Sequence, residues 1–584
     1  MVRNLQNSGI NIRLFKGNLI CKKSRLESRL IRGNVVPAVL IVMFFLPIGL
    51  QFLGNSVPDL AARYVIYDDA FYYLKIADNL YTKGMSSFDG IHSTNGYHPL
   101  WLVVLLFIRF LSNIEIFPTI TLVLQILLFG STGFLFFKLS RLLSETGSFA
   151  KPTSIMTHYI PSVIIVANPL LLLIVANGLD TSLSMFLLAG FFLAVFTIHY
   201  SHETSPDKNE SYCSHKKTLI LIAMGISAAT VLARLDYVIP VLFSLVSLNI
   251  VRSIKSRKAD RVFLILAVST VSVILLYMVI NKLLFDTFMP VSRIVKQEAL
   301  FHALFYSKWY GVSTAAASVF WPNAHFVWLG NYKFIIIGLA LSCIALASTH
   351  YTPRFRTANI ILILQGWVHS IGYLILQSSG SGYYYIPIVI SLIWSIYLII
   401  LAIRRILRES FLKIYERAIS IAFFALAISG SLAFDYTLNT YRPKYQWRND
   451  RFAAAEWISD NLPSDTRVGA WWAGALGYTA RQPVINLDGL VNNIQFVSIV
   501  KQCDTGKYLI DEQISYLADY FPFHPLKDNV GKPEVFFPTH CWWKILSDLD
   551  ALGYTLEIVR YWPDTHAGLS PDTGYYILRI KKRL

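Results

Sequence analysis

Two adjacent carboxylates are the first candidates for chemistry in this sequence. Asp68 and Asp69 lie in the stretch 64–101, which reads YVIYDDAFYYLKIADNLYTKGMSSFDGIHSTNGYHPLW. The stretch closely follows an apolar run, so both side chains are expected near a membrane surface. A carboxylate pair there costs free energy unless it binds a cation, acts as a base or joins a hydrogen-bond network. Alternatively, Asp69 caps a helix over 70–80, which leaves Asp68 unexplained.

The composition indicates that most of the chain lies in a membrane. Hydrophobic residues make up 54% of the 584 residues and charged residues only 15%, with a mean hydropathy of +0.49. A water-soluble domain carries about 25% charged residues. The formal net charge is +17, but the segment 437–584 holds 16 basic and 16 acidic residues. The basic excess therefore lies in short loops between apolar runs, which indicates positive-inside topology, and no nucleic-acid partner is expected.

The lengths of the apolar runs predict about eleven crossings within a transmembrane domain at 35–436. The basic segment 1–34 keeps the N-terminus in the cytoplasm, and the first crossing follows at 35–53. The others are expected at about 114–137, 158–176, 180–199, 217–233, 236–251, 262–284, 333–349, 358–378, 383–403 and 418–434. Two apolar stretches do not span: Pro99–Leu111 is too short, and Trp309–Trp328 is interrupted by Pro322.

This topology gathers polar residues from distant parts of the chain on the outer side of the membrane. The first outer loop, 54–98, lies there together with the turn at Asn177–Asp180. Further members are Arg234, Asp236, Arg293, Lys296 and the tyrosines at 383–385. Polar helix ends would explain one such place, whereas their recurrence on one side favours a shared pocket.

The segment 437–584 is expected to form a small extracytoplasmic α/β domain. It has ordinary charge density, an amphipathic stretch at Arg451–Asn461 and strand-like pieces at Arg467–Trp471 and Pro483–Leu487. Its two cysteines, Cys503 and Cys541, either form a disulfide or remain unpaired buried thiols. The predicted fold is thus a polytopic α-helical membrane protein with a C-terminal α/β domain.

The outer loop resembles a known group of membrane proteins. DDAFYYLKIADNL followed by NGYHPLW is similar to the first outer loop of GT-C superfamily glycosyltransferases. The likeness is greatest to the arabinosyltransferase-like and mannosyltransferase-like bacterial members. Shorter likenesses follow along the chain, at NGLDTSL, ARLDYV, MPVSRIVK and, in the C-terminal segment, VINLDGLVNN.

The resemblance implies transfer of a sugar from a polyprenyl-phosphate donor to a glycan, lipid or protein acceptor outside the cytoplasm. By motif position, Asp68 would be the general base and Asp69 its partner. The substrate-binding set that the resemblance and the topology suggest is Tyr97, His98, Asp180, Arg234, Asp236, Arg293 and Lys296. The cations would balance the charge of the phosphate leaving group. Asp180 stands where the family has Glu, and Leu235 where many relatives have Pro, so donor and acceptor choice stay open.

The roles of the histidines and of a metal stay open. His98 either contacts the donor phosphate or is a hydrogen-bonded interfacial residue, and His92 lies in the same loop. A divalent cation such as Mg²⁺ or Mn²⁺ between Asp68, Asp69 and a histidine is a further option, because some GT-C enzymes use one and others do not.

Two other classes of function compete with an enzyme. A transporter or flippase of lipid-linked saccharides would place charges near the middle of the bilayer, on interrupted helices. A non-catalytic scaffold for envelope assembly would leave the carboxylate pair unused. The glycosyltransferase hypothesis expects Asp68 to line an outward-facing cavity that is reached from the lipid.

Overall fold

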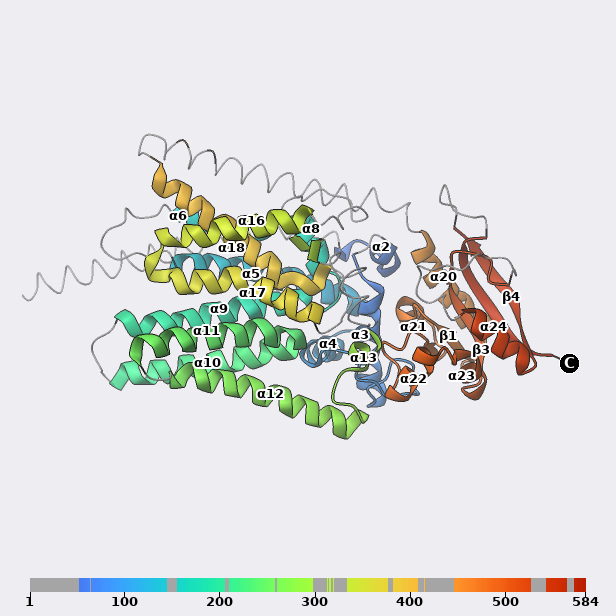
Figure 1. Cartoon of the computed structure of the whole chain (residues 1–584). Coiled ribbons are helices and arrows are strands. Elements are labelled where there is room, and N and C mark those ends of the chain that lie inside the picture. The colour runs from blue at the N-terminus through green and yellow to red at the C-terminus, as the bar shows by residue number, and fades with distance from the viewer. Residues whose placement is uncertain are drawn as a thin grey trace, which may run out of the picture.

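The computed structural model describes most of the chain from residue 52 onward. The described residues are 52–62, 65–143, 155–166, 168–204, 210–257, 260–297, 312–313, 315–316, 319, 333–375, 382–407, 414, 418, 446–526, 542–564 and 572–583. A bundle of long helices lies at one end and an α/β domain at the other (Figure 1). Four short helices lie between them: α2 (Val57–Ala62), α3 (Asp68–Lys83), α4 (Pro99–Leu111) and α13 (Val291–Val295).

Six helices of the described residues are long and apolar enough to cross a membrane. They are α5 (Phe117–Leu142), α9 (Thr181–Thr204), η1–α11 (Leu235–Tyr237 and Val238–Ser256), α12 (Arg261–Phe285), α16–η4 (Lys333–Ser348 and Thr349–Tyr351) and α18 (Ile386–Ile406). The chain is therefore a multi-pass membrane protein, as its composition predicts.

The remaining predicted crossings have different outcomes. The runs at 217–233 and 358–378 fall on α10 (Glu210–Ala233) and α17 (Arg356–Ile375). The run at 158–176 is divided among α6 (Ile155–His158), α7 (Ile160–Val166) and α8 (Pro169–Val175), and α8 begins at a proline that cannot continue a preceding helix. The runs at 35–53 and 418–434, the stretch 309–328 and the boundary near 436 lie mostly or wholly outside the described residues. The count of eleven stays a prediction.

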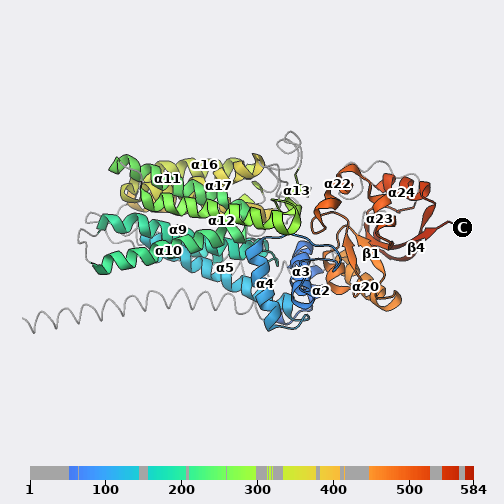
Figure 2. The same cartoon turned by 90° about the horizontal axis from the view of Figure 1, so that it is seen from below.

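The short apolar stretch at 99–111 forms one helix, α4, of 13 residues. Such a helix is about 20 Å long, which is less than the hydrocarbon thickness of a bilayer. Arg109 of α4 donates to Asp78 of α3 at 2.8 Å, so α4 is tied to α3 beside the bundle (Figure 2). The length of α4 therefore agrees with the expectation that this stretch is too short to cross a membrane.

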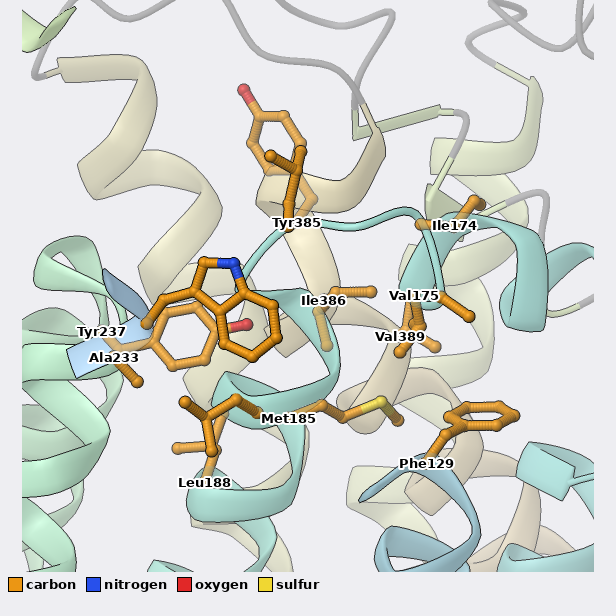
Figure 3. Packing of buried hydrophobic residues seen from close by; sticks show 14 of the residues in the cluster. Phe129, Ile174, Val175, Met185, Leu188, Ala233, Tyr237, Tyr385, Ile386 and Val389 are labelled. Atoms are coloured by element: carbon orange, nitrogen blue, oxygen red, sulfur yellow. The ribbon is translucent and has the colours of Figure 1, made fainter. Parts of the chain in front are cut away.

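A buried apolar cluster runs through the bundle and continues into the short helices and the C-terminal domain. Figure 3 shows members of this cluster from α5, α8, α9, α10, η1 and α18, namely Phe129, Val175, Met185, Leu188, Ala233, Tyr237, Ile386 and Val389. Helix α18 is 78% buried over its most apolar window, whereas α12 is only 17% buried. Helix α18 is therefore central, and α12 lies at the edge of the bundle with most of its apolar side chains exposed.

The C-terminal domain (446–583) is built on a five-stranded sheet of order β2-β1-β3-β5-β4. Strands β1 (Arg467–Ala470), β2 (Val484–Asn486) and β3 (Ile514–Phe521) are parallel. Strands β4 (Tyr554–Pro563) and β5 (Gly574–Lys582) join them in antiparallel fashion. The helices are α20 (Gln446–Asn461), α21 (Gly474–Thr479), α22 (Ile494–Gln502), α23 (Thr505–Asp511) and α24 (Trp542–Ala551).

The α/β character of this domain is confirmed, and β1 and β2 fall within the two stretches predicted as strands. Cys503 forms a disulfide. Its predicted partner Cys541 lies outside the described residues, so the pairing with Cys541 stays a prediction.

Candidate functional site

A cavity of about 400 Å³ lies where the helical bundle, the short helices and the C-terminal domain meet. Its lining comes from α3, the segment 96–98, the turns at 179–180 and 234–238, α12, the segment 289–297, Tyr373 of α17, Tyr384 and residues 490–491. Every residue predicted for the site lines this cavity, with the exception of Asp68: Asp69, Tyr97, His98, Asp180, Arg234, Asp236, Arg293 and Lys296. The residues predicted to lie on the outer side therefore line one pocket, although they are up to 227 positions apart in the sequence.

The two adjacent carboxylates point to different parts of the molecule. Asp68 accepts from Arg451 at 2.6 Å and from the backbone N–H groups of Gly474 and Ala475 at 3.1 and 3.0 Å, all in the C-terminal domain. Asp69 lines the cavity and lies 3.8 Å from Lys296. The motif position predicted that Asp68 lines the cavity with Asp69 as its partner, and the expectation for Asp68 is wrong because its carboxylate is turned to the C-terminal domain. Successive residues of a helix are rotated by about 100°, which separates the two side chains.

Capping does not explain Asp69. Helix α3 begins at Asp68, and its N-cap residue is Tyr67, which makes no side-chain capping bond. Both carboxylates lie in the first turn, where the positive end of the helix dipole stabilises negative charge. The helix ends at Lys83, with Gly84 in the left-handed region at φ 68°.

Lys296 is the cation closest to Asp69 among the contacts that the structure describes. Its ammonium group donates to the hydroxyl of Tyr384 at 2.9 Å, just before α18 begins. Burial acts to lower the pKa of Lys296, but the interaction with Tyr384 and the negative charges of Asp69 and Asp488 outweigh burial and raise it. Lys296 therefore carries a positive charge into the cavity at any physiological pH.

Arg234 is held rigidly by two carboxylates. Its guanidinium contacts Asp180 at 3.0 Å and Asp236 at 3.1 Å, and its side chain is only 1% exposed. Asp236 also lies 2.9 Å from His369 of α17, while Arg234 covers the ring of Tyr384 at 4.6 Å. The network fixes Tyr384 and, through it, Lys296. His369 was not predicted, because a single histidine in an apolar run gives no signal in the sequence.

His98 is a hydrogen-bond acceptor in the cavity wall. Burial lowers the pKa of its imidazole, and its Nδ1 accepts from the backbone of Leu235 at 3.5 Å. Its backbone N–H donates to the hydroxyl of Tyr73 at 3.2 Å. The neutral ring thus ties the outer loop to the Arg234 turn.

His92 belongs to a separate cluster away from the cavity. It lies 2.7 Å from Asp89 and 3.4 Å from Glu512 of the C-terminal domain. Burial lowers the pKa of His92, but these two carboxylates raise it by more. Within the described part of the chain, no group of three or more His, Cys, Asp or Glu side chains is arranged to hold a metal ion.

Two further residues of the site were not predicted from the sequence. Tyr72 lines the cavity, and its hydroxyl donates to Asp488 of the C-terminal domain at 3.1 Å. Burial raises the pKa of Asp488 to about 7, and the nearby charge of Asp69 raises it as well. Asp488 lies within the run VINLDGLVNN, which the sequence resemblance did include, but nothing in that run indicated proximity to Asp69.

Comparisons with known proteins show which folds this architecture resembles. Residues 438–558 match a family described as a domain of unknown function (DUF8728). No curated protein matches the chain. ArnT from Cupriavidus metallidurans, solved bound to undecaprenyl phosphate, is 12% identical and aligns with a TM-score of 0.51 over 92% of this chain and 97% of ArnT.

A second similar structure is an archaeal oligosaccharyltransferase, AglB from Archaeoglobus fulgidus, solved with an inhibitory peptide and a dolichol-phosphate. It is 12% identical and gives a TM-score of 0.48 over 81% of this chain and 69% of AglB. The ArnT alignment, which covers nearly the whole of both chains, identifies the architecture. The chain has the fold of the GT-C superfamily of integral-membrane glycosyltransferases.

Proposed function

We propose that this protein is a membrane glycosyltransferase that moves a sugar from a polyprenyl-phosphate donor to an extracytoplasmic acceptor in the cell envelope. The observation that carries the proposal is the pairing of Asp69 and Lys296 in one cavity, at 3.8 Å. A carboxylate beside an ammonium group offers a base for the acceptor and a cation for a phosphate. The GT-C fold and the undecaprenyl phosphate bound by ArnT support the donor class.

In the proposed reaction, Asp69 removes the proton from an acceptor hydroxyl as its oxygen attacks the anomeric carbon of the donor. The bond from that carbon to the phosphate oxygen breaks, and polyprenyl phosphate leaves with the bonding electrons. Lys296 and Arg293, which both line the cavity, stabilise the negative charge on the phosphate. This assignment makes Asp69 the base in place of Asp68, which is occupied by Arg451 and two backbone N–H groups.

The dimensions and lining of the cavity suit a lipid-linked sugar. A volume of about 400 Å³ falls in the range of small-molecule sites, which is about 300–1,000 Å³. Polar groups gather around Asp69, whereas Ile274, Met278 and Met289 form an apolar wall. The polar part would take the sugar phosphate, and the apolar wall would take the first isoprene units.

The charge distribution of the helices supports an active site outside the cytoplasm. Helices α11 and α18 begin beside the cavity and end in basic residues, Lys255 in α11 and Arg404 and Arg405 in α18. By the positive-inside rule, these basic ends face the cytoplasm. The cavity and the C-terminal domain would then lie on the opposite side of the plasma or inner membrane.

The experiment that tests the proposal uses the full chain in lipid nanodiscs with radiolabelled polyprenyl-phosphate sugars and acceptors extracted from envelopes. Wild-type protein should form a new glycosidic product, and Asp69→Asn should lose that product while it still inserts and folds. The exposed Asp511→Asn in the C-terminal domain is the matched control, with activity retained.

Two results would favour the competing functions. Movement of labelled lipid-linked saccharide across proteoliposomes, without a new glycosidic bond, would identify a transporter or flippase. Undiminished transfer by Asp69→Asn would remove this residue from the role of base.

A further inference from the structure

One turn of the C-terminal domain forms part of the cavity wall. Leu490 and Val491 line the cavity, and the preceding Asp488 and Gly489 complete the turn, with Gly489 at φ 82°. A Cβ at Gly489 would lie 3.2 Å from Val295, directly before Lys296. A Cβ at Gly96 would overlap the backbone oxygen of Leu490. The turn at 488–491 is therefore fitted closely against α13 and the outer loop.

Asp488 is the charged residue of this turn, and its contacts converge on the cavity. Asp488 as a whole residue is 4% exposed, and its carboxylate accepts from the hydroxyl of Tyr72 at 3.1 Å and from the backbone N–H of Leu490 at 2.8 Å. The amide of Asn486 donates to the same hydroxyl of Tyr72 at 3.2 Å. Tyr72 lies one helical turn after Asp69, on the same side of α3.

We propose that Asp488 is a positioning residue of the active site, through which the C-terminal domain orients Tyr72 and adjusts the electrostatic balance between Asp69 and Lys296. The inference rests on the proposed function, and it identifies the C-terminal domain as a component of the donor site. Without the turn at 488–491, the cavity would lose part of its wall and Tyr72 would lose its carboxylate partner, which leaves only Asn486 and the backbone oxygen of Trp471 beside its hydroxyl.

The charge of Asp488 should oppose the binding of an anionic donor. Asp69, Lys296 and Tyr72 are the titratable groups that interact with Asp488. Burial raises the pKa of Asp488 to about 7, so the group is neutral below this pH and negative above it. Ionised Asp488 competes with a phosphate for the positive charge of Lys296. Phosphate binding should therefore weaken as Asp488 ionises.

The experiment measures binding of undecaprenyl phosphate to the full chain in nanodiscs between pH 5.5 and 8.5. Asp488→Asn should bind about as tightly as wild type at pH 5.5 and roughly three- to tenfold more tightly at pH 8.5, the size expected for one partly screened charge. The titration of the lipid phosphate affects all variants equally. The ratio of the dissociation constant of wild type to that of the variant at each pH therefore reports only the effect of the substitution. Asp511→Asn should give a ratio of one throughout.

Tyr72→Phe provides a second variant, which keeps the ring and the charge of Asp488 but removes a hydrogen-bond donor. Since the hydrogen bond from Tyr72 lowers the pKa of Asp488, its loss should move the pH at which binding weakens to a higher value. Thermal unfolding confirms that both variants are folded. A wild-type pH profile in Asp488→Asn, together with an unshifted profile in Tyr72→Phe, would overturn the inference and leave the proposed function intact. Absence of lipid binding by wild type at every pH would overturn both.

Discussion

Asp68 and Asp69 follow each other in the sequence but serve two different regions, the contact with the C-terminal domain and the cavity. Asp68 is 17% exposed and lies 2.6 Å from a guanidinium that is itself only 4% exposed. Asp69 is 36% exposed and lies 3.8 Å from an ammonium group that is 24% exposed. A short, buried, multiply hydrogen-bonded pair holds two parts of a protein together. A longer and more accessible pair leaves carboxylate oxygens within reach of a ligand.

The largest expected effect is a difference in sugar-transfer activity between substitutions of Asp69 and of Asp68. Asp69→Asn should lower sugar transfer by roughly 10²- to 10⁴-fold, the usual contribution of a general base. Asp68→Asn should chiefly lower thermal stability, because it removes the carboxylate that neutralises buried Arg451. Transfer rates per folded molecule and unfolding curves, measured on the same samples, distinguish these outcomes. Loss of transfer in folded Asp68→Asn, with normal rates in Asp69→Asn, would reverse the comparison.

The next effect concerns the other side of the Asp68 contact. Arg451→Met should destabilise the protein by about 3–5 kcal/mol, since breaking a buried pair leaves an uncompensated charge. Protease sensitivity of the C-terminal domain and chemical denaturation of the full chain measure the change. Arg579→Met, at an exposed position of β5, is the control. Equal stability of the two variants would show that the Asp68 contact does not hold the domains together.

A smaller effect is expected on the cavity side. Lys296→Gln should weaken binding of undecaprenyl phosphate by about 1.5–3 kcal/mol, or roughly 10- to 150-fold, as for other hydrogen bonds to charged groups. Lys282→Gln is a suitable control, because Lys282 pairs with Asp286 at the end of α12 and does not line the cavity. Equal loss of binding in both variants would indicate attraction by general positive charge rather than a site at Lys296.

The smallest effect tests the fit between the two domains. A Cβ at Gly474 would overlap the backbone oxygen of Asp68, so Gly474→Ala should cost about 1–3 kcal/mol of stability. Gly225→Ala in α10 should be neutral or slightly stabilising, because no atom lies within 4 Å of its added Cβ. Thermal unfolding of the two variants measures the difference. Unchanged stability of Gly474→Ala would mean that the domains can move apart without cost.

Features encoded in neighbouring residues were predictable from the sequence. The length of Pro99–Leu111 predicted a helix too short to cross, and α4 has those bounds. The charges of the loops and the alternation of successive crossings predicted that Asp180, Arg234 and Lys296 lie on the same side of the membrane. All three line the cavity. These predictions depend only on run lengths and on the charges of short loops, which the local sequence contains.

The direction of each carboxylate was not predictable in this way. Motif position favoured Asp68 as the cavity residue, but the rotation of α3 is set partly by Arg451, which is 383 positions away. The partnership of Tyr72 with Asp488 spans 416 positions. Such contacts depend on how the helical part and the C-terminal domain dock. No pattern in a single sequence indicates this docking geometry.

Helix α12 has a consequence for how a ligand would find the cavity. Ile274, Tyr277 and Met278 occupy one side of the helix and line the cavity. Leu275, Leu276, Val279 and Ile280 on the other sides are 44–60% exposed in a helix that is long enough to cross the bilayer. A single helix, about 10 Å across, thus separates the cavity from the lipid phase. A lipid-borne ligand would search for the protein by diffusion in two dimensions. Its occupancy would then follow its mole fraction among the surrounding lipids rather than its concentration in solution.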